Sequence, residues 1–252
     1  MYNLILNENM KIYRRPRTWV MFGSIVSLVL IMSFILKLYG TEPITGWKAA
    51  DSLFSLTQLA IIFCIVIAGD TVTSEFSSGT IKMLLTQSQT RGRVLFSKYI
   101  SSIIFTLFML VTCLVVSVLV NGVLYGFGGM NTPSPHGGVF HVLMMKYVTV
   151  LISAVMYVTV AFLISSLSRS NVLSTLLSIL FFMLGPSLTA TLKGFEWSKY
   201  ILFANTDLMQ YIVGKPMFQG MTLGLSITVL IVYFIGMNVL TWSVFSKRDV
   251  TA

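Results

Sequence analysis

Six long runs of apolar residues constrain this sequence more than any other feature. Each run is close to the roughly 20 residues that an α-helix needs to cross the hydrocarbon core of a bilayer. A water-soluble fold would have to bury all of them in one core, which a chain of 252 residues is too small to do. The sequence therefore predicts an all-α membrane protein, one domain over residues 1–252, with about six transmembrane helices. The expected helices cover residues 19–39, 50–69, 99–125, 142–167, 172–192 and 221–245.

Charge is scarce in this chain and is placed mainly at the ends of the apolar runs. Charged residues make up 10% of the positions, whereas a soluble domain carries about a quarter. The net charge of +9 is not gathered into one basic patch with interleaved aromatic residues, so no nucleic-acid partner is expected. With the N-terminus inside, the inner segments hold eleven of the 17 basic residues, including every arginine. By the positive-inside rule we expect a multi-pass protein of a bacterial plasma membrane, with both termini in the cytoplasm.

Residues 1–17 are expected to form an interfacial helix along the inner surface of the membrane. A helix here presents one apolar face and leads into a basic cluster at residues 14–17, followed by Trp19. Basic clusters and tryptophan are typical of the membrane interface, which makes a frayed tail the weaker interpretation. The segment has no small-residue cleavage site after a short apolar core, so we expect the first helix to be retained.

A charged region over residues 70–98 separates the second and third runs. Insertion costs about 3 kcal/mol for each charge at the membrane centre, so this region is expected to lie in the cytoplasm. The second helix is expected to continue to about Ser78, where Gly79 ends it. A Thr80 cap then begins a short amphipathic helix over residues 80–86.

Two other connecting segments have a distinct composition. Residues 126–141 are rich in Gly and Pro, which predicts turns without regular structure. Residues 193–220 form an outer amphipathic segment, rich in aromatic residues, that is expected to lie in the interface or to re-enter between helices. Gly185 and Pro186 are expected to interrupt the fifth helix just before this segment.

The usual motifs of catalysis and metal binding are missing. No G-x-x-x-x-G-K-[ST] pattern occurs, so this chain is not expected to bind nucleotide phosphates or hydrolyse ATP by itself. His136 and His141 lie in the Gly/Pro loop without clustered carboxylates, and we expect no metal site. No Ser-His-Asp arrangement is apparent, so an enzyme is not expected. Cys64 and Cys113 fall within apolar runs, where thiols behave as small hydrophobic groups and not as disulfide partners.

The placement of the acidic residues bears on the source of energy for any transport. All eight acids are expected near or outside helix ends. An ion-coupled carrier usually keeps an ionisable group near the membrane midplane to bind the driving ion. If this protein moves a substrate, the energy is therefore expected to come from another protein.

Two short stretches resemble a known family. Residues 69–70, the stretch EFSSGTIKMLL at 75–85, and the basic positions Arg91 and Lys98 resemble the inner loop of type-two ATP-binding-cassette exporter permeases. The sequence FSKRDV at residues 245–250 is similar to the tail of those permeases. Each motif is short, but together with six helices and two inner termini the resemblance extends over essentially the whole chain.

This resemblance implies a half-transporter, the membrane subunit of an exporter. Two permease subunits, identical or different, would form the pathway within membrane lipid, and separate ATPase subunits would bind ATP and Mg²⁺, so this chain would bind no cofactor. In that family the short helix after the second membrane helix is the coupling helix, here residues 80–86. The residues implied in ATPase coupling are Glu75, Gly79, Thr80, Ile81, Lys82, Leu84, Leu85 and Arg91. The second and fifth helices line the pathway in that family, which nominates Thr57, Gln58, Ser178 and Phe182.

Simpler interpretations stand beside each of these roles. For Asp70 a helix-capping role is favoured over a direct one, and Glu75 is as well described as a solvated acid near Lys82. The basic residues Arg91, Arg93 and Lys98 would equally serve as anchors at lipid head groups. For each of the four pathway candidates, ordinary helix packing is favoured over a role in the pathway. The alternative functions are a non-transporting scaffold or sensor subunit and an ion-coupled carrier. A lipid-like or amphipathic peptide cargo would suit the aromatic segment, but the cargo is left open.

Overall fold

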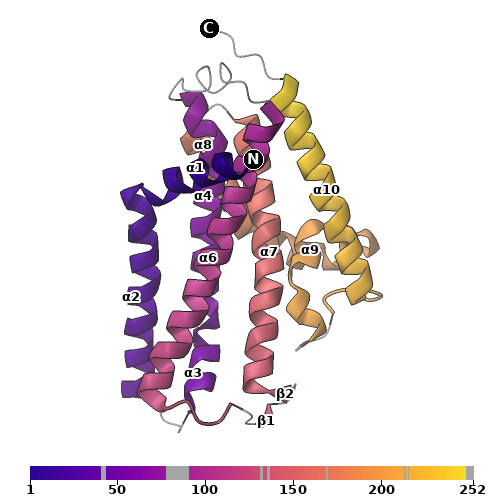
Figure 1. The fold of residues 1–252 in the computed structure, drawn as a ribbon. Coiled ribbons are helices and arrows are strands. Elements are labelled where there is room, and N and C mark those ends of the chain that lie inside the picture. The colour runs from indigo at the N-terminus through magenta and orange to yellow at the C-terminus, as the bar shows by residue number, and fades with distance from the viewer. Residues whose placement is uncertain are drawn as a thin grey trace.

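The computed structural model describes residues 1–40, 44–77, 91–130, 133–134, 137–168, 170–212, 214 and 216–247. Within these residues, six helical stretches are long and apolar enough to cross a membrane, which confirms the prediction of an all-α membrane protein. The long helices run roughly side by side, and short elements join them (Figure 1). The helices of the six stretches are α2 (Pro16–Tyr39), α3 (Gly46–Ser52), η1 (Leu53–Leu56) and α4 (Thr57–Ser77), α6 (Arg91–Tyr125), α7 (Val139–Leu167), α8 (Asn171–Thr191) and α10 (Leu223–Lys247).

The bundle has two distinguishable ends in Figure 1. At one end lie the N-terminal helix α1 (Tyr2–Tyr13), the last turn of α4, the first turn of α6 and the last turn of α10. We call this the α1 end. The opposite end carries the small hairpin of β1 (Pro133–Ser134) and β2 (Gly137–Gly138), and we call it the hairpin end.

The second membrane-spanning stretch begins earlier than predicted. It starts at Gly46 and consists of α3, the 3₁₀ turn η1 and α4, whereas the sequence favoured a start near residue 50. The side chain of Thr45 caps α3 by accepting a hydrogen bond from the backbone N–H of Lys48 at 3.4 Å. The cap sets the start of the helix more strongly than hydropathy does, because the polar residues of α3 fall within the first two turns of a capped helix.

The predicted N-terminal helix is present as α1, and its orientation differs from a simple amphipathic pattern. The apolar side chains of Tyr2, Leu6 and Met10 are exposed, whereas Glu8 and Ile12 are buried against the rest of the protein. In Figure 1 α1 lies crosswise to the long helices and packs on α6. The exposed apolar face suits contact with lipid, as expected for a helix at a membrane surface.

Helix α4 is the centre of the packing and contacts α6, α7 and α8. Its buried face includes Ala60, Cys64 and Ala68, and the facing part of α7 includes Ala154 and Ala161. Small side chains let neighbouring helices approach closely, which is how membrane helices gain van der Waals contact without a hydrophobic driving force.

Two expectations about the connecting segments are wrong. The Gly/Pro segment contains the β1–β2 pair, in which Pro133 is opposite Gly138, and α7 begins directly after it at Val139. The helix α8 continues through Pro186 to Thr191 without interruption. A proline removes one backbone donor, and so close to the end of a helix this loss is small compared with the packing that holds α8 in place.

Residues 193–220 return into the bundle, as in the second of the two arrangements expected for them, and we call them the inserted segment. Their short elements are η2 (Leu192–Gly194), which begins one residue earlier, η3 (Glu196–Tyr200), α9 (Leu202–Thr206) and η4 (Leu208–Tyr211). Figure 1 shows α9 beside the middle of α7 and α10. The carboxamide of Asn205 accepts from the hydroxyl of Ser226 on α10 at 2.6 Å and donates to the carbonyls of Lys199 and Ile201, both at 2.8 Å. These bonds satisfy backbone groups that a non-helical segment would otherwise leave without partners.

Candidate functional site

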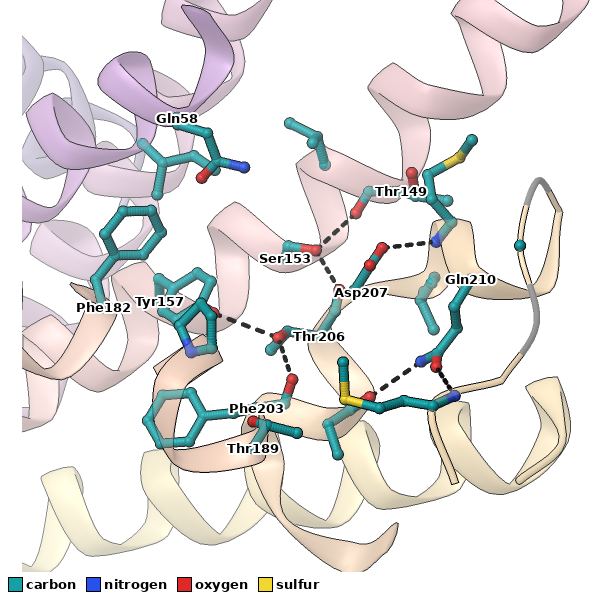
Figure 2. A pocket seen from close by; sticks show the side chains of 18 of the residues that line it. Gln58, Thr149, Ser153, Tyr157, Phe182, Thr189, Phe203, Thr206, Asp207 and Gln210 are labelled. Carbon is teal, nitrogen blue, oxygen red and sulfur yellow. Dashed lines mark hydrogen bonds between the residues drawn. The ribbon is translucent and has the colours of Figure 1, made fainter. Parts of the chain in front are cut away.

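A cavity of about 1030 Å³ lies between α4, α7, α8 and the inserted segment, and we call it the cavity. Figure 2 shows Gln58, Tyr157 and Phe182 on one side of it, with Asp207 and Gln210 on another. Its apolar lining includes Phe54, Ile61, Tyr157, Phe182 and Phe203. Its polar lining includes Gln58, Lys146, Ser153, Lys193, Thr206, Asp207 and Gln210. A large concave site with a mixed, mainly apolar lining is typical of a ligand-binding site.

Hydrogen bonds hold the inserted segment against α7 along one wall of the cavity. The hydroxyl of Ser153 donates to the backbone carbonyl of Thr206, and the hydroxyls of Tyr157 and Thr206 are 3.3 Å apart (Figure 2). Within the segment, the amide of Gln210 donates to the carbonyl of Ala204 at 3.0 Å and accepts from the N–H of Met217 at 2.9 Å. The cavity wall formed by α9 and η4 is therefore held by bonds to α7 and by bonds within the segment itself.

The four pathway candidates divide into two pairs. Gln58 and Phe182 line the cavity. Thr57 and Ser178 are buried. The hydroxyl of Thr57 donates to the backbone carbonyl of Phe54 and the hydroxyl of Ser178 donates to that of Ser174, both at 2.7 Å. The first pair is available to a ligand, whereas the second belongs to the packing of the helices.

Several cavity residues were not among the candidates from the sequence. Ser153 and Tyr157 lie on the fourth spanning helix, and Thr206, Asp207 and Gln210 lie on the inserted segment. Part of the signal was present, because the segment was expected to re-enter between helices. The sequence gives no pattern that would show which face of α7 it contacts.

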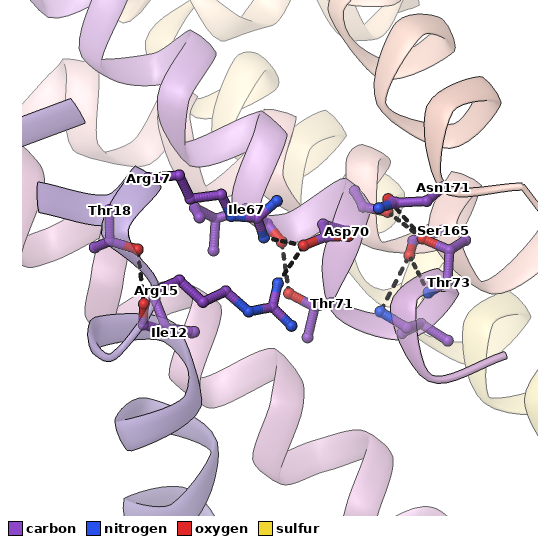
Figure 3. A network of polar contacts seen from close by, with 12 residues as sticks. Ile12, Arg15, Arg17, Thr18, Ile67, Asp70, Thr71, Thr73, Ser165 and Asn171 are labelled. Atoms are coloured by element: carbon purple, nitrogen blue, oxygen red, sulfur yellow. Dashed lines mark hydrogen bonds and ion pairs between the residues drawn. The ribbon is translucent and has the colours of Figure 1, made fainter. Parts of the chain in front are cut away.

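At the α1 end, Asp70 has a different role from the one that the sequence favoured. It is 2% exposed and lies within α4, which continues to Ser77, so the helix-capping interpretation is wrong. Its carboxylate oxygen Oδ2 accepts hydrogen bonds from Arg15 and Arg17 (Figure 3), whereas Oδ1 has no hydrogen-bond partner among the described residues. The ion pairs connect α4 to the corner between α1 and α2.

A second buried ion pair connects α1 to α6. The ammonium of Lys98 lies 2.7 Å from one carboxylate oxygen of Glu8, and the ammonium of Lys11 lies 2.6 Å from the other. Burial raises the pKa of Glu8, but Lys98 and Lys11 outweigh this effect and hold the pKa below its ordinary value of 4.5. Because the Lys98 side chain is only 3% exposed, the interpretation of Lys98 as a lipid head-group anchor is wrong. Arg93, which is exposed, retains both interpretations.

The opposite side of α4 is attached to the corner between α7 and α8. The hydroxyl of Ser165 accepts from the backbone N–H groups of Val72 and Thr73, both at 3.3 Å, and the hydroxyl of Thr73 donates to Asn171 at 3.1 Å (Figure 3). The hydroxyl of Ser174 donates to the carbonyl of Gly69 at 3.0 Å. The part of α4 nearest the α1 end is therefore held from two sides, by arginines on one and by hydroxyl groups on the other.

The residues implied in ATPase coupling fall at the α1 end or outside the described residues. Glu75 lies in the last turn of α4, and Arg91 is the first residue of α6. The positions that lie outside the described residues are Gly79, Thr80, Ile81, Lys82, Leu84 and Leu85. The prediction of a coupling helix over residues 80–86 therefore stays a prediction.

No cluster of three or more His, Cys, Asp or Glu side chains that could hold a metal ion occurs in the described part of the chain. Cys64 and Cys113 are both buried as free thiols, as expected for cysteines within apolar runs.

The sequence matches the family described as "Protein of unknown function (DUF2705)" over residues 16–251. It is similar to the "Uncharacterized protein YhcI" of Bacillus subtilis (strain 168), with 30% identity over 311 aligned positions that cover 99% of both chains. It is also similar to the "Uncharacterized membrane protein YdbK" of the same organism, with 32% identity over 249 positions that cover 96% of this chain and 99% of the relative. The match reaches from the start of α2 to beyond the end of α10, and the chain therefore belongs to the DUF2705 family.

Proposed function

We propose that this chain is the membrane subunit of an ATP-driven exporter of the type-two ATP-binding-cassette class. Two such subunits, identical or different, form the translocation pathway, and separate ATPase subunits dock at the α1 end, which faces the cytoplasm of a bacterium. ATP and Mg²⁺ bind to the ATPase subunits. This chain contributes the pathway and transmits the force, and it carries out no hydrolysis itself.

The observation that carries this proposal is the course of α4. Near its beginning, Gln58 and Ile61 line the cavity, and near its end Asp70 is held by two arginines before the helix reaches the α1 end. One unbroken helix of 21 residues thus joins the cavity to residues 78–90, the segment that resembles a coupling region. A continuous helix transmits a rigid-body displacement, whereas a flexible connection would absorb it.

The attachments around α4 support the same proposal. The Asp70 pairs connect α4 to the α1–α2 corner, and the Glu8–Lys98 pair connects α1 to α6. The helices on both sides of residues 78–90 are thereby linked to one another through α1. A load applied to residues 78–90 would therefore move α4, α6 and α1 together.

The proposal is tested by purification of the affinity-tagged chain from membranes of its own bacterium in a mild detergent. We expect a nucleotide-binding subunit to copurify in a stable ratio and the complex to hydrolyse ATP. Recovery of the chain without any such subunit would contradict the proposal and favour a scaffold or sensor. Transport that follows a proton or sodium gradient without ATP would identify an ion-coupled carrier instead.

The coupling role of one residue is tested on the same complex. Glu75→Gln should lower ATP-dependent transport, or the phenotype linked to the ATPase, without loss of the chain from the membrane. The matched control is Glu196→Gln, the same chemical change at an exposed acid of the inserted segment. Equal effects of the two substitutions would argue against a coupling role for Glu75.

A further inference from the structure

The lysine and aromatic residues that line the cavity are set at different depths along their helices. Lys146 is seven residues from the start of α7, which lies at the hairpin end, and Lys193 is next to the end of α8. Tyr157 and Phe182 lie near the middle of their helices, and Ile61 lies near the middle of the second spanning stretch. At 1.5 Å per residue, the distance from Lys146 to Tyr157 along α7 is about 16 Å, which is about half the thickness of a hydrocarbon core. Lys146 thus lies nearer the membrane surface, and Tyr157 lies about half a hydrocarbon core deeper along the same cavity.

We propose that the cavity binds a lipid-sized amphiphile, with its polar head near Lys193 and Asp207 and its single apolar tail against Tyr157 and Phe182. The head is zwitterionic, with one positive and one negative group. That this amphiphile is the transported substrate rests on the proposed function. Its binding to the cavity requires only this chain.

The charges at the polar end favour a zwitterionic head. Lys146 is already paired with Asp51, their charged atoms being 2.6 Å apart. Lys193 and Asp207 are both exposed and line the same cavity, so each is accessible to an opposite charge on a ligand. A head with a net charge would be attracted by one of these two groups and repelled by the other, whereas a zwitterionic head is attracted by both.

The cavity is exposed in part along α4 and α8, on the side of the bundle. Gln58 on α4 and Met183 and Pro186 on α8 line the cavity and are exposed, Met183 to 65%, whereas Ile61 at the back is 1% exposed. A sideways opening in spanning helices admits a ligand that is already dissolved in the membrane. The amide of Gln58, which lies near the middle of a spanning stretch, would lack a hydrogen-bond partner in hydrocarbon and is satisfied by an ester or amide group of the ligand.

The size of the cavity distinguishes a single-tail amphiphile from larger cargo. Its volume of about 1030 Å³ lies at the upper end of the roughly 300–1,000 Å³ of sites for drug-sized ligands. A drug-sized molecule or an amphiphile with one tail therefore suits this volume.

The experiment uses the purified full chain in lipid nanodiscs and a single-tail phosphocholine with a photoreactive diazirine at the end of its tail. After illumination, mass spectrometry should place the crosslinks on peptides of α4, α7 and α8 that line the cavity. Excess phosphocholine without the diazirine should suppress them. Crosslinks spread evenly over the lipid-facing residues would show ordinary contact with bulk lipid and overturn the proposal.

A matched pair of variants tests the location of the site. Met183→Trp fills the opening and should lower crosslinking about fivefold or more, whereas Leu184→Trp should leave it unchanged. Both residues are exposed and adjacent on α8, but only Met183 lines the cavity. Equal crosslinking of the two variants would overturn the proposal even if both fold normally.

A second pair of variants tests the head group. Probes with the same tail and a sulfate, trimethylammonium or phosphocholine head are compared. Lys193→Gln should weaken binding of the sulfate probe and strengthen binding of the trimethylammonium probe, and Asp207→Asn should do the opposite. The asparagine retains an oxygen that can accept from the N–H of Met209, as Asp207 does at 3.1 Å. If neither variant changes the binding of any of the three probes, the assigned head site is excluded.

These outcomes are separable from those of the proposed function. Failure to bind the amphiphile would leave an ATP-driven exporter with a different substrate. Binding to a chain that copurifies with no ATPase would leave the site in place and refute the transporter.

Discussion

At the scale of single residues, the carboxylate of Asp70 has the largest electrostatic consequence. It is the shared partner of Arg15 and Arg17, whose side chains are 41% and 37% exposed, while its own side chain is 3% exposed. Removing one member of a buried ion pair typically costs about 3–5 kcal/mol, because the remaining charge loses its compensation. Here the arginines reach solvent, which limits the cost to the lower part of that range.

We expect Asp70→Ala to lower the free energy of unfolding by about 3 kcal/mol. The measurement is thermal unfolding of the purified chain in mild detergent. In a double-mutant cycle with Arg15→Ala, the coupling energy should exceed about 1 kcal/mol because the two residues share one interaction. Additive effects of the two substitutions would show that the ion pair contributes no stability.

The Glu8 ion pairs predict a dependence of stability on pH. Because the pKa of Glu8 is lowered in the folded protein, its contribution is present above the pKa of the unfolded chain, near 4.5, and is lost as the pH falls through the folded value. The wild-type protein should therefore unfold at a higher temperature than Glu8→Gln at pH 7, and the difference should shrink as the pH falls below about 4.5. A difference that is constant between pH 7 and pH 3.5 would contradict this assignment.

Neither of these ion pairs was predictable from a local pattern. Arg15 and Asp70 are 55 positions apart in the sequence, and Glu8 and Lys98 are 90 positions apart. Their charges correctly indicated that the surrounding segments lie at one end of the bundle. Which acid meets which base depends on how α1 packs on α6 and how the start of α2 packs on α4, and this packing has no periodic signature.

At the scale of elements, the close approach of α3 to the end of α6 depends on Gly46. A Cβ atom at this position would lie 2.5 Å from the carbonyl oxygen of Gly126 and 2.8 Å from that of Asn121, and neither backbone atom can rotate away. We expect Gly46→Ala to destabilise the protein by about 1–3 kcal/mol, as overpacking does elsewhere. Gly128→Ala is the control, because nothing lies within 4 Å of its added Cβ atom. Equal unfolding temperatures of the two variants would refute the tight contact at Gly46.

The elements differ in how well the sequence predicted them, and the reason is physical. A membrane requires each spanning helix to satisfy its own backbone within one continuous apolar stretch, so the spans are encoded locally and were predicted. The inserted segment instead relies on partners in other elements, such as Ser226 for Asn205 and Ser153 for Thr206. Its return into the bundle was one of two expected arrangements, but its short helices and its contacts with the cavity required the structure.

At the scale of the whole molecule, the cavity and the α1 end lie at different depths of one bundle, and α4 joins them. This arrangement gives the proposed mechanism a direction, because a push at residues 78–90 reaches the cavity only if the α1 end faces the cytoplasmic ATPase. The proposed direction rests on the expectation that six spans place both ends of the chain on one side and that the distribution of arginine favours the cytoplasm.

Cysteine labelling in intact cells tests this direction. The two native cysteines are buried, so an introduced thiol should dominate the reaction with a membrane-impermeant maleimide. Lys82→Cys should react only after the cells are opened, whereas Gly128→Cys, at an exposed position between α6 and β1, should react in intact cells. Reaction of Lys82→Cys in intact cells would place residues 78–90 outside, where no ATPase has access to ATP. The energy for any transport through the cavity would then have to come from a source other than ATP.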